Sequence, residues 1–101
     1  MKFGLKVKDI DNIKKVFANY NDVNKVIIYG SRAMGNYRNN SDIDLVMFGN
    51  NLDLSVLSKI ETDLDDLLLP YKIDLSIFAY IDNKDLIDHI KQNGIVFYQL
   101  K

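Results

Sequence analysis

Several features that would restrict the class of this protein are absent from its sequence. No cysteine occurs among its 101 residues, so a disulfide framework and a thiolate metal site are both excluded. No apolar run approaches the ~20 residues that span a bilayer, and the N-terminal segment lacks the apolar region of a signal peptide. We therefore expect a cytoplasmic protein without membrane association.

An excess of charge of one sign is also missing. Thirteen basic and fourteen acidic residues leave a net charge of −1, which gives no general attraction to a polyanion, so we expect no direct nucleic-acid binding. Apolar residues make up 48% and charged residues 27%, the mixture of an ordinary folded protein. The length fits one folded domain over residues 1–101.

Hydrophobic spacing predicts helices that alternate with short β-branched runs. Expected helices cover 9–20, with Asp9 as N-cap, 57–68, which Pro70 helps to end, and 83–94, with Asn83 as N-cap. Expected strands cover 25–30, 42–48, 71–78 and 95–100, the last as an edge strand. This order indicates an α/β fold with a small mixed sheet of three to four strands flanked by helices. The short first link favours an antiparallel pair, and the helical crossover after it favours a parallel pair.

The expected strand "DIDLVMF" carries two aspartates among apolar residues. Because side chains alternate along a strand, Asp42 and Asp44 point to one face. Asp74 interrupts the next strand in the same way, so the three carboxylates could converge. Such neighbours raise one another's pKa unless a cation lies between them, and oxygen clusters suit Mg²⁺. The alternative is structural: one aspartate caps a turn and another faces water at a sheet edge.

A Gly-Ser pair stands directly after the first strand. Gly30 would let a polyphosphate approach the backbone, and Ser31 offers a hydroxyl and an amide, which we expect at the start of a short helix. Arg32 adds a possible phosphate contact. An isolated Gly-Ser pair is more often only a turn, and "GSRAMG" is not a P-loop because no Gly-Lys-Ser/Thr follows. The glycine-serine pair becomes a specific signal only in combination with the strand aspartates that follow it.

The set resembles a known family. Gly30-Ser31, a gap of ten residues, Asp42-x-Asp44 and a later Asp74 are similar to the nucleotidyltransferase fold of the DNA polymerase beta superfamily. With "GSRA" and "SDIDL", the chain is most similar to its minimal nucleotidyltransferases, which accompany HEPN-domain partners in toxin–antitoxin pairs. The resemblance implies that Ser31 holds the triphosphate of ATP, that Asp42 and Asp44 bind Mg²⁺, and that Asp74 completes the metal site and assists the acceptor hydroxyl.

The sequence departs from the family pattern at Met34, where many members have a second arginine. Arg38 would take over that phosphate contact if the loop folds back, and the alternative is a solvated arginine in "NYRNN". His89, the only histidine, has no partner of obvious spacing, and we expect a structural or surface role for it.

The resemblance implies a single minimal nucleotidyltransferase domain that transfers AMP from ATP to a hydroxyl of a HEPN RNase toxin, as its antitoxin. No separate C-terminal domain is expected, so the partner would complete the acceptor site. The first alternative is an antitoxin that neutralises the toxin by binding alone. The second is nucleotide transfer to a small molecule or an RNA end.

Overall fold

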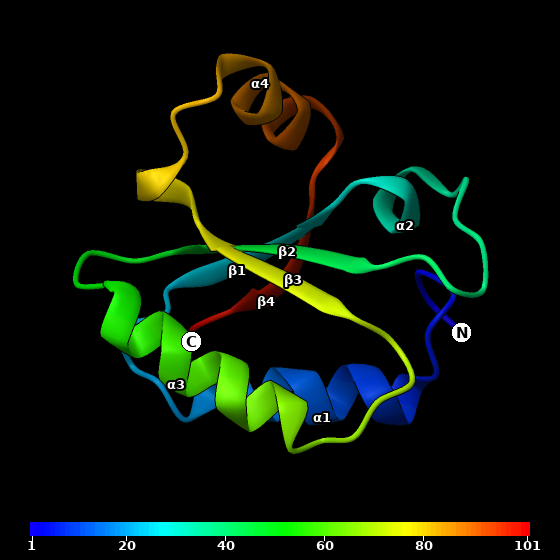
Figure 1. The fold of residues 1–101 in the computed structure, drawn as a ribbon, viewed down its shortest axis with the longest axis horizontal. Coiled ribbons are helices and arrows are strands. Elements are labelled where there is room, and N and C mark those ends of the chain that lie inside the picture. Colours follow the sequence, from blue (N-terminus) through cyan, green and yellow to red (C-terminus); the bar gives the residue numbers. More distant parts are fainter.

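One mixed sheet of four strands lies between helices on both of its faces (Figure 1). The computed structural model describes residues 1–101. The elements, in chain order, are α1 (Val7–Ala18), β1 (Lys25–Tyr29), α2 (Ser31–Met34), β2 (Ile43–Phe48), α3 (Leu54–Asp65), β3 (Ile73–Ile77), the 3₁₀ helix η1 (Phe78–Tyr80), α4 (Lys84–Asn93) and β4 (Ile95–Gln99). None of the helices has the length and apolar character needed to cross a membrane.

The strand pairing confirms the mixed α/β sheet. The strand order is β3-β2-β1-β4, with β1 antiparallel to β2 and β2 parallel to β3, as the connection lengths predict. The last strand, β4, lies at the sheet edge, as expected, and pairs antiparallel with β1, with a register shift between Val26 and Ile27. The β2–β3 pair is the one that matters for the site, because it aligns the aspartates of the two strands.

Helices α1 and α3 cover one face of the sheet (Figure 1). The residues of β2 on this face, Ile43, Leu45 and Met47, are fully buried. They belong to a core cluster of 17 buried residues that includes the apolar stripe of α1. Burying this face fixes the register of β2, because a slip by one residue would turn the aspartates inward.

Two helix boundaries differ from the sequence-based prediction. Helix α1 begins at Val7 after Lys6, which makes no side-chain cap, so Asp9 is not the N-cap; it lies in the first turn, where its charge suits the helix dipole. Helix α3 starts earlier than expected because the Asp53 carboxylate accepts a hydrogen bond from the Val56 N–H at 2.9 Å. It also ends at Asp65, before Pro70 can act.

The other face of the sheet is covered at only one end. Tyr29, Val46 and Ile90 form a small second cluster under α4 and η1, with partly buried apolar residues around it. Helix α4 begins as predicted, with the Asn83 side chain accepting from the Leu86 N–H at 3.1 Å. The remaining part of this face, where β1 ends and β2 and β3 begin, carries polar side chains instead.

Candidate functional site

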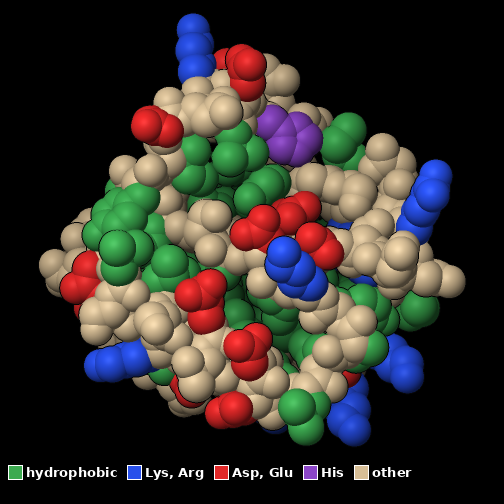
Figure 2. All heavy atoms as spheres, in the orientation of Figure 1, with side chains coloured by type: hydrophobic (Ala, Val, Ile, Leu, Met, Phe, Trp, Pro, Cys, Tyr) green, Lys and Arg blue, Asp and Glu red, His purple; other side chains and the backbone are tan.

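The three strand aspartates lie at this open end of the sheet. Asp44 and Asp74 are register partners on the parallel strands β2 and β3, so their side chains leave the same face of adjacent strands. Asp42 lies two residues before Asp44, just ahead of β2. Asp42 and Asp74 are exposed and Asp44 is half-buried. Figure 2 shows carboxylates gathered near the middle of this view of the molecule.

The local charges bear on protonation at Asp44. Burial raises the pKa of its carboxyl above the ordinary value, and the nearby Asp74 and Asp42 charges raise it further, while His89 acts in the opposite direction. Burial likewise raises the pKa of the Tyr29 phenol, with added contributions from Asp44 and Asp74. The Asp44 carboxyl is therefore harder to ionise than an ordinary aspartate, and a cation bound beside it would favour the ionised form.

The donor set has the chemistry of a magnesium site. Hard carboxylate oxygens on adjacent strands are the ligands that Mg²⁺ takes in proteins, usually one or two together with substrate phosphates and water. No group of three or more His, Asp or Glu side chains is arranged to hold a metal ion in the conformation shown. The aspartates fit the ion by chemistry and placement, and side-chain rotation would have to close them around it.

The Gly30–Ser31 turn lies directly against Asp44. Gly30 has φ 75° and ψ −155°, a conformation that is essentially restricted to glycine. A Cβ at this position would stand 2.4 Å from Oδ2 of Asp44, so only glycine lets the turn and the carboxylate approach this closely. Ser31 then begins the one-turn helix α2, as the sequence suggested. A phosphate group at Ser31 would therefore lie beside a cation at Asp44.

The Arg32 side chain, for which the sequence suggested a phosphate contact, is buried in the scaffold. The side chain is 2% exposed. Its guanidinium donates hydrogen bonds to the backbone carbonyl oxygens of Phe3, Asn39 and Ser41. The rings of Tyr37 and Tyr71 lie against it, with centroids 5.3 and 4.9 Å from Cζ. These contacts engage the guanidinium within the scaffold, and its phosphate contact stays a prediction. Met34 and Arg38 are exposed.

His89 is the site residue that sequence reasoning missed. Its Nε2 accepts a hydrogen bond from the backbone N–H of Gly30 at 3.3 Å, across 59 residues of sequence. The Asn93 amide nitrogen lies 3.2 Å from His89 Nδ1, and the Tyr29 ring meets the imidazole edge to face at 6.2 Å. The one available signal was local: His89 and Asn93 are four residues apart and share a helix face.

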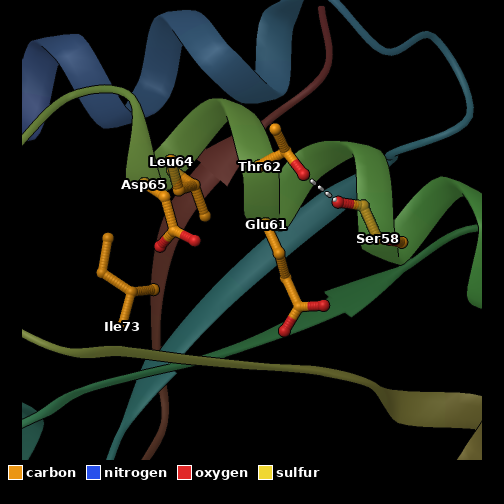
Figure 3. A pocket seen from close by; sticks show the side chains of 6 residues that line it. All are labelled: Ser58, Glu61, Thr62, Leu64, Asp65 and Ile73. Atoms are coloured by element: carbon orange, nitrogen blue, oxygen red, sulfur yellow. Dashed lines mark hydrogen bonds between the residues drawn. The ribbon is translucent and has the colours of Figure 1, made fainter.

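The cavities of the molecule lie elsewhere. Four are present, and none is lined by the three aspartates or the Gly-Ser turn. Figure 3 shows one of about 320 Å³ between α3 and the start of β3, where the Thr62 hydroxyl donates to the Ser58 carbonyl oxygen at 3.0 Å. Its lining residues are Ser58, Glu61, Thr62, Leu64, Asp65 and Ile73. The candidate site is thus an open surface.

Comparison with known proteins identifies a family for this chain. Residues 11–101 match the family model described as "Polymerase beta, Nucleotidyltransferase". No curated protein matches the chain significantly.

Several solved structures share the fold, and three of them are toxin–antitoxin structures. A toxin–antitoxin with AMP-PNP has a TM-score of 0.73 at 19% identity, covering 91% of this chain and 74% of that one. The MntA–HepT toxin–antitoxin gives 0.67 at 16% identity, covering 94% and 74%. The tri-AMPylated Shewanella oneidensis HEPN toxin in complex with MNT antitoxin gives 0.67 at 17% identity, covering 92% and 71%. At these identities the likeness shows the fold alone.

Proposed function

Since the chain belongs to the polymerase beta nucleotidyltransferase family, we propose that it transfers AMP from ATP to a hydroxyl group of a partner protein, with Mg²⁺. The observation that carries the proposal is the pairing of Asp44 with Asp74 on adjacent strands, directly beside the Gly30–Ser31 turn. Phosphate-binding and cation-binding groups then meet at one place, as transfer of a nucleotidyl group requires.

Each residue of the site has a distinct task. The backbone at Gly30 and the hydroxyl and amide of Ser31 bind the triphosphate and orient its α-phosphorus. Asp42, Asp44 and Asp74 would hold Mg²⁺. When bound, the ion neutralises charge on the attacking and leaving oxygens of the displacement. Without a bound cation the carboxylates repel the phosphates, so the carboxylates also determine where the phosphates can bind.

Asp74 is the residue placed to assist the acceptor. It is exposed, so it can be reached by a hydroxyl from a second molecule. That hydroxyl oxygen bonds to the α-phosphorus, the bond from the α-phosphorus to the oxygen leading to the β-phosphorus breaks, and pyrophosphate leaves. The hydroxyl proton passes to Asp74 acting as general base.

This assignment predicts that Asp74→Asn separates binding from turnover. General base catalysis contributes ~10²-fold or more, so kcat should fall about that much, while the Kd for Mg·ATP changes less than about threefold. Calorimetry gives the Kd and radioactive transfer gives kcat. Equal proportional losses in both, or normal turnover, would contradict the assignment.

The acceptor that best fits is a HEPN-domain toxin, with a tyrosine as the hydroxyl. One structure with this fold is an MNT antitoxin in complex with a tri-AMPylated HEPN toxin, and another is the MntA–HepT toxin–antitoxin. The open position of the site also suits a protein acceptor, because no cavity of this chain encloses a small one there.

The test is to incubate the protein with a neighbouring HEPN-domain partner, ATP and Mg²⁺, and to measure the partner's mass and RNase activity. The parent should add AMP and silence the RNase. The Asp42→Asn, Asp44→Asn double variant should still bind but add no mass and leave the partner active. Asp65→Asn, Asp66→Asn is the matched control, because it removes two exposed charges at the C-terminal end of α3.

One outcome would favour the alternative of neutralisation by binding. If the double variant silences the RNase as well as the parent does, and neither adds mass, the enzymatic proposal is wrong. An added nucleotide on RNA or a small molecule, with the partner unmodified, would point to the other acceptor classes.

A further inference from the structure

We propose that His89 is a positioning residue: by accepting the hydrogen bond from the Gly30 N–H, it fixes the turn that presents Ser31 to the nucleotide. The link to the nucleotide rests on the proposed function; the link to the turn does not. Helix α4 then contributes a positioning residue to the site, although it carries none of the residues of the motif.

The strand pairing of β1 ends just before Gly30, whose N–H donates the hydrogen bond to His89. Tyr29 is the last residue of β1 paired with β2, and Ile28 is the last paired with β4, opposite Ile95. The N–H of Gly30 therefore lies beyond the last strand pair and has no strand acceptor. The imidazole of His89 supplies that acceptor, with Nε2 at 3.3 Å from the amide nitrogen. The bond extends the fixed part of the backbone by one residue, into the turn.

Two further side chains contact the imidazole ring of His89. Asn93, one helical turn later, lies against its Nδ1 at 3.2 Å, and the buried ring of Tyr29 packs edge to face on it. The next residue, Ile90, is 1% exposed and anchors α4 to the sheet. A half-buried acceptor held in this way can determine the direction of a backbone amide, whereas a mobile surface side chain cannot.

The turn needs such an anchor because of its glycine. Glycine has the widest backbone freedom of any residue, and α2 after it has only four residues. Without the bond, rotation at Gly30 would redirect the Ser31 amide and hydroxyl away from the carboxylates. Fixing the turn before the nucleotide arrives lowers the ordering cost of binding.

Two substitutions separate the hydrogen bond from the packing of the ring. H89F keeps an aromatic ring against Tyr29 but has no acceptor, whereas H89Q keeps an acceptor near the position of Nε2 but has no ring. The Gly30 amide resonance in a ¹H–¹⁵N spectrum reports on the turn, and calorimetry gives the Kd for Mg·ATP. Q92A, at an exposed position of the same helix, is the control.

We expect H89F to shift the Gly30 amide resonance and to weaken Mg·ATP binding by about three- to tenfold, the effect of one hydrogen bond. H89Q should restore both readouts to near the parent, and Q92A should change neither. If H89F leaves the Gly30 resonance unchanged, or if H89Q is impaired as much as H89F, the hydrogen bond does not position the turn. Should H89F fail to fold, H89L serves as the variant without an acceptor.

Failure of the proposed function gives a different result. A parent that does not bind Mg·ATP would contradict the proposed function, and the Gly30 resonance in H89F and H89Q would then decide the role of His89 by itself. A parent and an H89F variant that bind Mg·ATP equally well would leave the proposed function in place and overturn the positioning role.

Discussion

The Arg32 side chain joins three segments of the chain. From α2 its guanidinium reaches the N-terminal segment at Phe3 and the loop before β2 at Asn39 and Ser41. The fork geometry of the guanidinium supplies several donors at fixed angles, which a lysine ammonium cannot reproduce.

We predict that Arg32→Lys lowers the free energy of unfolding by about 2–4 kcal/mol, because it leaves buried carbonyl oxygens without donors. Urea denaturation measures the change. Arg38→Lys, at an exposed position of the same loop, should change it by less than about 0.5 kcal/mol. Equal small effects of both substitutions would show that the buried contacts of Arg32 carry little stability.

The raised pKa of the Asp44 carboxyl makes the free energy of unfolding depend on pH. Its pKa is raised in the folded state, chiefly by burial and then by Asp74 and Asp42, so ionisation is harder there than in the unfolded chain. Stability is therefore lost as pH rises from the ordinary aspartate pKa through the raised one. Because the group is partly exposed, solvent screening reduces the effect to about 1 kcal/mol or less.

Without Mg²⁺, Asp44→Asn should be more stable than the parent at pH 7, by up to about 1 kcal/mol. The gain should disappear below about pH 3.5, where the carboxyl is protonated in both states. Urea denaturation at the two pH values tests this. A variant less stable than the parent at pH 7, or a gain that is independent of pH, would contradict the electrostatic account.

At the scale of elements, α2 is flanked by two glycines with positive φ. Gly30 precedes the helix with φ 75°, and Gly35 follows it with φ 86°. They differ in surroundings: a Cβ at Gly35 would meet nothing within 4 Å, whereas a Cβ at Gly30 would collide with Asp44. The pair thus separates backbone strain from the close approach at the site.

We predict that Gly35→Ala lowers stability by about 1 kcal/mol through strain alone and leaves the Kd for Mg·ATP within about twofold. Gly30→Ala should lower stability by about 1–3 kcal/mol. It should also weaken Mg·ATP binding more than tenfold, because Asp44 must move. Denaturation and calorimetry on the two variants provide the test. Equal nucleotide affinities would mean that the contact between Gly30 and Asp44 is dispensable.

The sheet and its helices were predictable because their signals are local. Period-two alternation in β2 fixes which side chains face the core, and the Asn83 cap marks the start of α4. The shared face of Asp42 and Asp44 follows from the same alternation. The predicted helix ends were less accurate. Asp53 caps α3 and starts it at Leu54, but the leucine spacing from which the helix was predicted does not reveal this cap.

The roles of Arg32 and His89 could not be read from the sequence. Arg32 is buried by tyrosines that lie 5 and 39 residues away along the chain, at positions 37 and 71. His89 meets Gly30 only because α4 folds back over the end of β1. Neither contact has a spacing rule, so tertiary packing decided both.

For the whole molecule, the arrangement of layers explains why the site is open. Helices α1 and α3 close one face of the sheet, while α4 and η1 cover part of the other (Figure 1). The carboxylates lie on the uncovered part, which gives a large acceptor direct access. The proposed transfer to a partner protein follows from this exposure together with the family to which the chain belongs.

Calorimetric titration with ATP, with and without Mg²⁺, tests the central claim most directly: that the strand aspartates and the Gly-Ser turn form one magnesium–nucleotide site. The parent should bind Mg·ATP, and it should bind ATP alone far more weakly, because the triphosphate would then face the carboxylates without a cation. The Asp42→Asn, Asp44→Asn variant should lose at least about tenfold in Mg·ATP affinity, or ~1.4 kcal/mol, while the Asp65→Asn, Asp66→Asn control binds like the parent. Equal Mg·ATP affinity in the double variant and the parent would contradict the claim.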